Sequence, residues 1–224
     1  LAHALYGELP DHLFEYVAIG TIADLVPLVG ENRYLVQRGL QALKQSPNPW
    51  VKAICDASGA NKKDINEETV GFYFGPRLNA IGRLGSAEPG VHFLMSEDPL
   101  QANTLATKLN DKNTERKKIV EDITNEAMAM IEDDASLKDS LVLVVAGEGW
   151  NPGVVGIVAS RLVEKYYRPT IVLSLNHEKG IAKGSARSIE GFHLFNELAK
   201  NRDILPHFGG HPMAAGMTLP IEHV

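Results

Sequence analysis

The sequence predicts an α/β protein in which two compact parts are joined by one long helix. Three observations support this prediction. No glycine or proline follows Pro99 until after residue 133, which is typical of one uninterrupted helix. After residue 136, short apolar runs alternate with helical patterns, as they do in an α/β sheet. Before the long helix, amphipathic segments follow one strand-like run at residues 15–19.

Composition sets the class of protein. The chain has 224 residues, 44% hydrophobic and 22% charged, which is typical of a globular protein with one large or two ordinary domains. No apolar run approaches the roughly 18 residues that cross a bilayer, so we expect no membrane partner. Cys55 is the single cysteine, which favours core packing and a reducing, cytoplasmic location. Because the chain starts in mid-pattern at Leu1, we expect it to be a piece of a longer protein.

Charge is distributed unevenly along the chain. The formal net charge of −6 argues against a protein that coats nucleic acid through a broad basic surface. Residues 1–135 carry 13 basic and 20 acidic side chains, whereas residues 136–224 carry 9 and 8. The second part is therefore the better candidate for binding an anion.

The first element of interest is the apolar run at residues 15–19, which Gly20 closes. This run predicts a buried strand. Asp24 would then lie at the carboxyl end of that strand, where ligands of open sheets gather. A carboxylate at that place either binds a hard metal ion or caps the next segment. Helices are predicted at residues 31–45 and 49–57.

An arginine-rich segment follows. Residues 69–87 contain no acidic side chain but include Arg77 and Arg83. Asn79 and Arg83 are four residues apart, so a helix would place the amide and the guanidinium on one face. Two unpaired arginines among glycines would suit phosphates. The alternative is a glycine-interrupted connector with solvated arginines.

The long helix has a polar middle. Asp98 is placed to cap its start, and apolar residues follow a stripe only toward its two ends, since residues 110–118 include no large apolar side chain. A helix that is polar all round is expected where it bridges two domains. Asn113 and Arg116 share one face of this bridge, so they either line a cleft or form a solvated face.

The part after the bridge has the pattern of a compact α/β domain. Predicted strands are at 141–146, 170–175, 180–185 and 213–219, and predicted helices at 152–167 and 192–200. A Gly-x-Gly at 147–149 lacks the rest of a dinucleotide fingerprint. We therefore predict no nucleotide cofactor.

A Gly-Ser-Ala-Arg-Ser pentapeptide at residues 184–188 carries the first phosphate-binding signal. On a strand, Ser185 and Arg187 face the same side, and Ser188 follows. A hydroxyl beside a forked cation is a common way to hold phosphate oxygens. An ion pair between Arg187 and Glu190 is the alternative.

The second signal lies at residues 207–216, His-Phe-Gly-Gly-His-Pro-Met-Ala-Ala-Gly. Gly209 and Gly210 tolerate positive φ and would let the backbone turn and present N–H groups to an anion. His211 would then come close to the ligand. The alternative is a buried structural histidine at a glycine turn.

Six motifs in order resemble the RecJ family of single-stranded-DNA-specific 5′→3′ exonucleases, within the DHH phosphoesterase superfamily. They lie at residues 19–33, 75–84, 109–116, 149–161, 184–188 and 208–211, and they cover nearly the whole chain. The resemblance implies the end of a parallel-sheet DHH domain at 1–96, a connecting helix at 97–135 and a smaller mixed-sheet DHH-associated domain at 136–224. The active site would lie in the cleft between the domains.

The resemblance also implies chemistry. Members of this family use two divalent ions, Mn²⁺ or Mg²⁺, to release 5′-mononucleotides from single-stranded DNA in repair and recombination, with a helicase and a single-strand-binding protein as partners. Asp24 matches the last metal-ligand motif. The chain has no Asp-His-His motif and no Asp-x-Asp placed as a metal motif. One carboxylate cannot hold a metal pair, so we expect this piece to be inactive alone.

Roles carry over by motif. Asp24 and His211 match catalytic positions, with Asp24 a metal ligand. Strand-binding positions are Arg77, Asn79, Arg83, Asn113, Arg116, Ser185, Arg187, Ser188, Gly209 and Gly210. Asn151 stands where many relatives have histidine, which puts an imidazole role there in doubt. Two other functions fit the residues: a DHH phosphodiesterase for short oligonucleotides or cyclic dinucleotides, and a non-catalytic phosphate-binding module.

Overall fold

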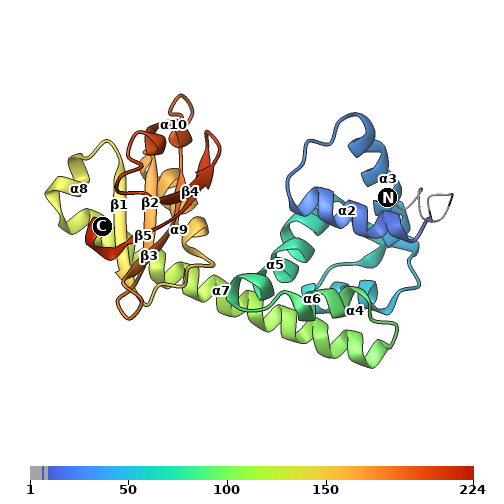
Figure 1. The fold of residues 1–224 in the computed structure, drawn as a ribbon. Coiled ribbons are helices and arrows are strands. Elements are labelled where there is room, and N and C mark those ends of the chain that lie inside the picture. Colours follow the sequence, from blue (N-terminus) through green and yellow to red (C-terminus); the bar gives the residue numbers. More distant parts are fainter. Residues whose placement is uncertain (1–6, 8–9) are drawn as a thin grey trace. The chain divides into compact units, whose positions relative to one another are not determined.

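The structure is a computed structural model that describes residue 7 and residues 10–224. The chain forms two compact units, Leu1–Glu115 and Arg116–Val224 (Figure 1). Their boundary falls inside the long helix α7 (Pro99–Asp133). The limits 1–96, 97–135 and 136–224 stay a prediction. Among the described residues, no helix is both long and apolar enough to span a bilayer.

The first unit is built from helices. They are α2 (Leu13–Ala23), α3 (Gly30–Gln45), α4 (Pro49–Ser58), α5 (Gly75–Leu84) and α6 (Glu88–Leu94), with the short segments η1 (Lys62–Asp64) and η2 (Thr69–Phe74) and the first part of α7. Trp50, Phe74 and Phe93 are among its largest fully buried side chains. Their burial supplies the main driving force for this unit.

The strand predicted at residues 15–19 is wrong, because these residues lie inside α2. Helix α2 packs directly on α3, where a Cβ at Gly39 would lie 2.2 Å from the Phe14 carbonyl oxygen and 2.5 Å from the Ala18 Cβ. Asp24 therefore follows a helix instead of a strand. Residues 7 and 10–115 contain no strand at all, so the parallel sheet expected of a DHH domain has no strand in this part of the chain.

Other helix limits follow local signals. Pro49 occupies the first turn of α4, and Gly59 ends it in the left-handed conformation with φ 74°. The Asp98 carboxylate accepts the N–H groups of Leu100 and Gln101 and so caps α7 as predicted. Cys55 is 2% exposed, and burial raises its pKa to about 11, which confirms that its role is core packing.

The second unit is a five-stranded mixed sheet with helices (Figure 1). In chain order it contains α8 (Ala135–Asp139), β1 (Leu143–Glu148), α9 (Val155–Tyr166), β2 (Thr170–Asn176), β3 (Ile181–Arg187), α10 (Leu194–Ala199), β4 (His207–Gly210), β5 (Ala214–Pro220) and η3 (Ile221–His223). The strand order is β1-β2-β3-β5-β4, and β1 and β2 are the parallel pair. Strands β1, β2, β3 and β5 match the predicted strands within a few residues.

Helices α9 and α10 pack on opposite faces of this sheet. Leu194 and Leu198 of α10 belong to one apolar cluster with Ala182 and Ala186 of β3. Ser185 lies between these alanines in the strand and so points the other way, where Gly156 of α9 approaches it. The sheet thus has one face toward α10 and one toward α9.

Strand β4 and helix α8 were not predicted. The glycines of residues 207–210 were assigned to a turn, but these residues pair with β5 as an edge strand. The turn falls at residues 211–213, where the His211 N–H donates to the Ala214 carbonyl oxygen at 2.8 Å.

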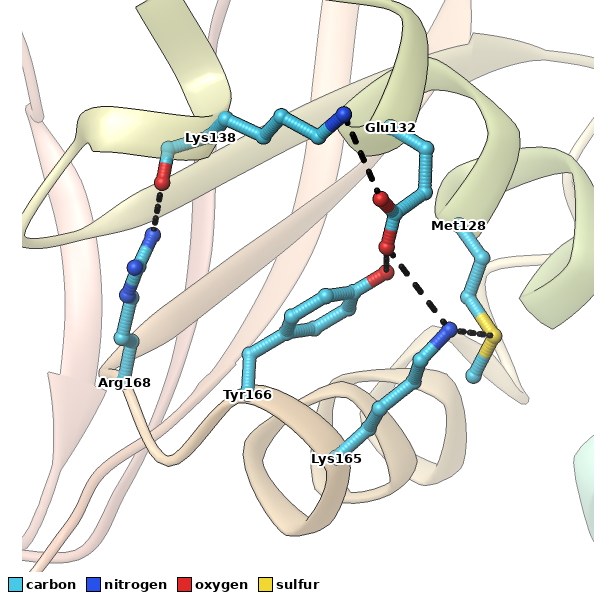
Figure 2. A network of polar contacts seen from close by, with 6 residues as sticks. All are labelled: Met128, Glu132, Lys138, Lys165, Tyr166 and Arg168. Atoms are coloured by element: carbon cyan, nitrogen blue, oxygen red, sulfur yellow. Dashed lines mark hydrogen bonds and ion pairs between the residues drawn. The ribbon is translucent and has the colours of Figure 1, made fainter. Parts of the chain in front are cut away.

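A polar network joins the end of α7 to the rest of the second unit (Figure 2). The Tyr166 hydroxyl donates to the Glu132 carboxylate at 2.8 Å, and the Lys138 and Lys165 ammonium groups lie 3.6 and 3.9 Å from it. The hydrogen bond from Tyr166 is the main cause that lowers the pKa of Glu132, and burial is the main cause that raises the pKa of Tyr166. The last turns of α7 are therefore part of the second unit.

Candidate nucleic-acid interface

In the second unit, the face of the sheet that carries α9 is only partly covered. Helix α9 packs on β2 and β3, whereas on the same face Gly216 of β5 and Gly209 of β4 are exposed. The strand register places Ser185, Gly216 and Gly209 side by side across three strands. Gly216 and Gly209 thus form an open row next to Ser185, which we call the glycine row.

Packing does not explain two of the glycines in this region. A Cβ at Gly209 or Gly216 would meet no atom of the described residues within 4 Å, and neither residue has a positive φ. Gly210 is different, because a Cβ there would lie 2.3 Å from the Ala214 carbonyl oxygen. Gly209 and Gly210 were expected to let the backbone turn, but both lie in a strand and neither has a positive φ. What glycine provides at 209 and 216 is a flat surface that a ligand can approach closely.

Ser185 and Arg187 are held together at one end of this row. Arg187 Nη1 donates to Ser185 Oγ at 3.0 Å and to the Ala186 carbonyl oxygen at 2.8 Å. The Ser185 hydroxyl lies 3.4 Å from the Ala215 carbonyl oxygen, to which it donates. The prediction that Ser185 and Arg187 share one face is confirmed, and the hydrogen bonds fix the guanidinium beside the hydroxyl.

Gly156 lets the start of α9 approach this pair. A Cβ at Gly156 would lie 2.9 Å from both Ser185 Oγ and Arg187 Nη2. Gly156 is the second residue of α9, so the positive end of the helix dipole lies close to the hydroxyl and the guanidinium. All three features favour an anion at the same place.

His211 and Ser188 are adjacent to this pair in different ways. His211 is exposed at the tip of the β4–β5 hairpin, so the alternative of a buried structural histidine is wrong. The Ser188 N–H donates to the Met213 carbonyl oxygen at 2.9 Å, which joins the end of β3 to that tip. Ser188 itself is 5% exposed, and its hydroxyl donates to the Phe192 carbonyl oxygen at 2.8 Å. Its hydroxyl thus already holds the loop.

Asp24 lies in an unfavourable local setting. It is exposed and follows the last residue of α2, where the negative end of the helix dipole disfavours a carboxylate. The next residue, Leu25, has φ 55°, a conformation that costs a residue other than glycine of order 1 kcal/mol. Two unfavourable features at one point suit a functional carboxylate better than a structural one.

In the first unit, Arg77 is a structural link between two helices. It is half-buried in α5, its Nε donates to Asn110 Oδ1 of α7 at 3.1 Å, and its Nη1 donates to the Tyr73 carbonyl oxygen at 2.8 Å. Burial lowers the pKa of Arg77. The expectation that this arginine is unpaired was wrong.

The other predicted residues of this region differ in exposure. Asn79 and Arg83 are exposed on α5, which is a helix and not a glycine-interrupted connector. On α7, Asn113 is 2% exposed and Arg116 is half-buried. The face of α7 that carries Asn113 is therefore not a solvated face.

The described residues do not supply a metal pair. No group of three or more His, Cys, Asp or Glu side chains within residue 7 and residues 10–224 is arranged to hold an ion. Asp24 offers one carboxylate, whereas a two-metal centre needs several ligands. The donor set of the described residues does not fit two divalent ions.

Two residues of the interface were absent from the predicted set. Gly156 stood in a stretch noted only for its glycines and valines, and Gly216 ended the 207–216 motif. The signal that finds Gly216 is the strand register, which sets it opposite Gly209 and beside Ser185. Strand register depends on pairing between segments that are distant in sequence, so a short sequence motif does not predict it.

Comparisons with known proteins agree with this architecture. Residues 138–224 match the DHHA1 domain family. The chain is 57% identical over 224 residues to the single-stranded-DNA-specific exonuclease RecJ of Bacillus subtilis strain 168, covering 100% of this chain and 28% of that protein. Crystal structures of RecJ from Thermus thermophilus with Mg²⁺ and with Mn²⁺ superpose with a TM-score of 0.82 at 32% identity, covering 97% of this chain and 33% and 32% of those chains.

Residues 138–224 of the second unit thus form a DHHA1 domain, in which the glycine row lies beside the pair of Ser185 and Arg187. The chain as a whole belongs to the RecJ family of DHH proteins. It spans about a third or less of the length of the relatives named above.

Proposed function

We propose that this chain is part of a single-stranded-DNA-specific 5′→3′ exonuclease that releases 5′-mononucleotides in DNA repair and recombination. Within that enzyme, its second unit holds the DNA strand near the 5′ end. The glycine row beside the Ser185–Arg187 pair is the observation that carries this proposal. A family likeness alone would not say which surface of the chain meets the strand.

The second unit suits a nucleic-acid strand because it combines an exposed, flat backbone surface with a defined position for a phosphate. Gly209 and Gly216 leave room for a sugar or base to lie against the backbone. Beside them, the Ser185 hydroxyl, the Arg187 guanidinium and the start of α9 converge. Hydroxyls, arginines and helix N-termini are the groups that contact phosphates in nucleic-acid complexes.

Each residue of this surface has a proposed role. Arg187 pairs with a phosphate oxygen through its fork of N–H groups, and the Ser185 hydroxyl turns from the Ala215 carbonyl oxygen to donate to a second phosphate oxygen. His211 at the hairpin tip donates from its imidazole to the terminal or scissile phosphate. Ser188 acts as a positioning residue, because its N–H and hydroxyl hold the loop next to that tip.

The first unit contributes residues that guide the incoming strand. Asn79 and Arg83 are exposed on one helix and guide the incoming DNA, whereas Arg77 keeps α5 against α7 through Asn110. Asn113 and Arg116 contribute from α7. Asp24 is one ligand of the metal centre that holds Mn²⁺ or Mg²⁺ in the whole enzyme, and this chain alone does not retain the ions. We also propose that the enzyme is cytoplasmic and acts with a helicase and a single-strand-binding protein.

Release of mononucleotides from a labelled single strand in the presence of Mn²⁺ tests this function. We expect release by the full-length protein and none by the 224-residue chain, which should still bind the strand. Loss of release on Asp24→Ala in the full-length protein supports the assigned ligand. Release by the isolated chain that survives Asp24→Ala would mean that the chemistry resides in other residues and would overturn the proposal.

A further inference from the structure

A pocket lies on the α9 face of the sheet, outside the site described above. It has a volume of about 440 Å³ and lies between the loop that follows β1 and the hairpin that joins β2 to β3. Its lining residues include Asn151, Pro152, Asn176, Lys179 and Lys183. The pocket thus sits at the carboxyl ends of the parallel pair β1 and β2, where ligands of α/β sheets commonly bind. Its volume suits a nucleotide.

One wall of this pocket is fixed before any ligand binds. The Trp150 indole lies over Gly147, where a Cβ would be 2.1 Å from the ring, and its Nε1 donates to Glu126 at 2.8 Å. The Ser174 hydroxyl donates to the Trp150 carbonyl oxygen at 2.5 Å. Because both the side chain and the backbone of Trp150 are held, the neighbouring Asn151 has a defined position.

The two asparagines present donors to the pocket. Asn151 Oδ1 accepts the Gly153 N–H at 2.8 Å, and Asn176 Oδ1 accepts the Lys179 N–H at 2.9 Å. Both amide oxygens are therefore already bonded to backbone. Within the described chain, neither Nδ2 group donates to another protein group. The NH₂ groups remain to donate to a ligand.

The charge of the pocket is positive. Of the described residues that line it, two are lysines and none is acidic. No carboxylate of residue 7 or residues 10–224 lies within 4.0 Å of the Lys179 or Lys183 ammonium group. A pocket that offers two ammonium groups and two amide NH₂ groups is matched by a ligand rich in acceptors, such as a phosphate.

The position of Lys183 connects this pocket to the glycine row. Lys183 and Ser185 face the same side of β3 and are two residues apart, which is about 6.6 Å along a strand. That separation is comparable with the distance between neighbouring phosphates of an extended single strand. We propose that this pocket is a second phosphate subsite, which holds a nucleotide of the bound strand on the side away from Arg187. The proposal rests on the proposed strand-binding function.

Equilibrium binding of a 5′-phosphorylated dT₁₂ strand to the 224-residue chain tests the subsite. Lys179→Ala with Lys183→Ala should weaken binding about 10-fold and reduce the slope of log Kd against log salt by about 1.4, since each phosphate contact in a single strand contributes about 0.7. Lys52→Ala with Lys200→Ala removes the same charge from exposed lysines that pair with nearby carboxylates of their own segments, Asp56 and Glu197. This control should leave the slope unchanged.

A second measurement distinguishes a phosphate of the bound strand from that of a free nucleotide. The side-chain NH₂ signals of Asn151 and Asn176 should shift in NMR spectra when the dT₁₂ strand is added. Thymidine 5′-monophosphate at the same concentration should produce little shift, because it lacks the neighbouring phosphates that place a nucleotide there. Equal shifts with the mononucleotide would show a site for free nucleotide and overturn the proposal.

The outcomes separate this inference from the proposed function. If Ser185→Ala with Arg187→Ala weakens strand binding but the Lys179/Lys183 pair of substitutions leaves both affinity and slope unchanged, the subsite is wrong and the proposed function stands. If the unaltered chain does not bind the strand at all, the strand-holding role fails and the subsite fails with it.

Discussion

Substitution of Gly209 or Gly216 by alanine separates a functional glycine from a structural one. A Cβ at either position meets no described atom within 4 Å, and glycine inside a strand is less stable than alanine by roughly 0.5–1 kcal/mol. Each substitution should therefore raise the melting temperature by roughly 2–4 °C. The added methyl group also projects from the exposed backbone surface of the glycine row. It should weaken binding of a single strand by about 10-fold.

Gly210→Ala is the matched control for this experiment. Gly210 is also exposed and is the next residue of β4, but its Cβ would lie 2.3 Å from the Ala214 carbonyl oxygen. Such a clash should destabilise the hairpin by about 1–3 kcal/mol. Thermal unfolding and fluorescence anisotropy with a labelled strand measure the two effects separately.

Two results would refute this reasoning. Unchanged strand affinity in the stable Gly209→Ala and Gly216→Ala variants would show that the strand does not lie on the glycine row. A loss of stability in these variants as large as in Gly210→Ala would show that the space above the row is filled by the protein itself.

Three further predictions follow from the contacts. Gly156→Ala should change stability little, because the better helix propensity of alanine, about 1 kcal/mol, is offset by the displacement of Ser185 Oγ and Arg187 Nη2 by the added methyl group. The same displacement should weaken strand binding, and unchanged binding argues against that anion position. Glu132→Gln should lower the melting temperature at neutral pH and much less at acidic pH. A carboxyl whose pKa is lowered in the folded state loses its stabilising contribution as the pH falls through the folded-state pKa. An equal loss of melting temperature at both pH values contradicts this. The pKa of Cys55 is raised to about 11, so its thiol should react with iodoacetamide far more slowly in the folded than in the denatured chain. Mass spectrometry measures the two rates, and equal rates would disprove the burial of Cys55.

Local signals were sufficient for the elements whose limits are set within their own segment. The absence of glycine and proline after Pro99, with Asp98 as a cap, predicted α7. Short apolar runs predicted four of the five strands of the second unit, including β3 with Ser185 and Arg187 on one face. These features depend on periodicity and capping, which short windows of sequence contain.

The errors arose where contacts between distant segments decide the structure. Residues 16–19 form a short apolar run without helical periodicity, which resembles a buried strand. In the structure this run belongs to α2, which packs closely on α3 at Gly39. Residues 207–210 contain two glycines, which disfavour a strand, but pairing with β5 overrides that preference. The burial of Asn113 and the link from Arg77 to Asn110 also depend on packing against α7.

The central claim is that Arg187 and its neighbours hold the 5′ phosphate of a single strand. The most direct test compares the affinity of the 224-residue chain for one strand with a 5′ phosphate and with a 5′ hydroxyl. We predict tighter binding of the phosphorylated strand, and loss of that preference in Arg187→Ala. Equal affinity for the two strands, or a preference that Arg187→Ala leaves intact, would contradict the account.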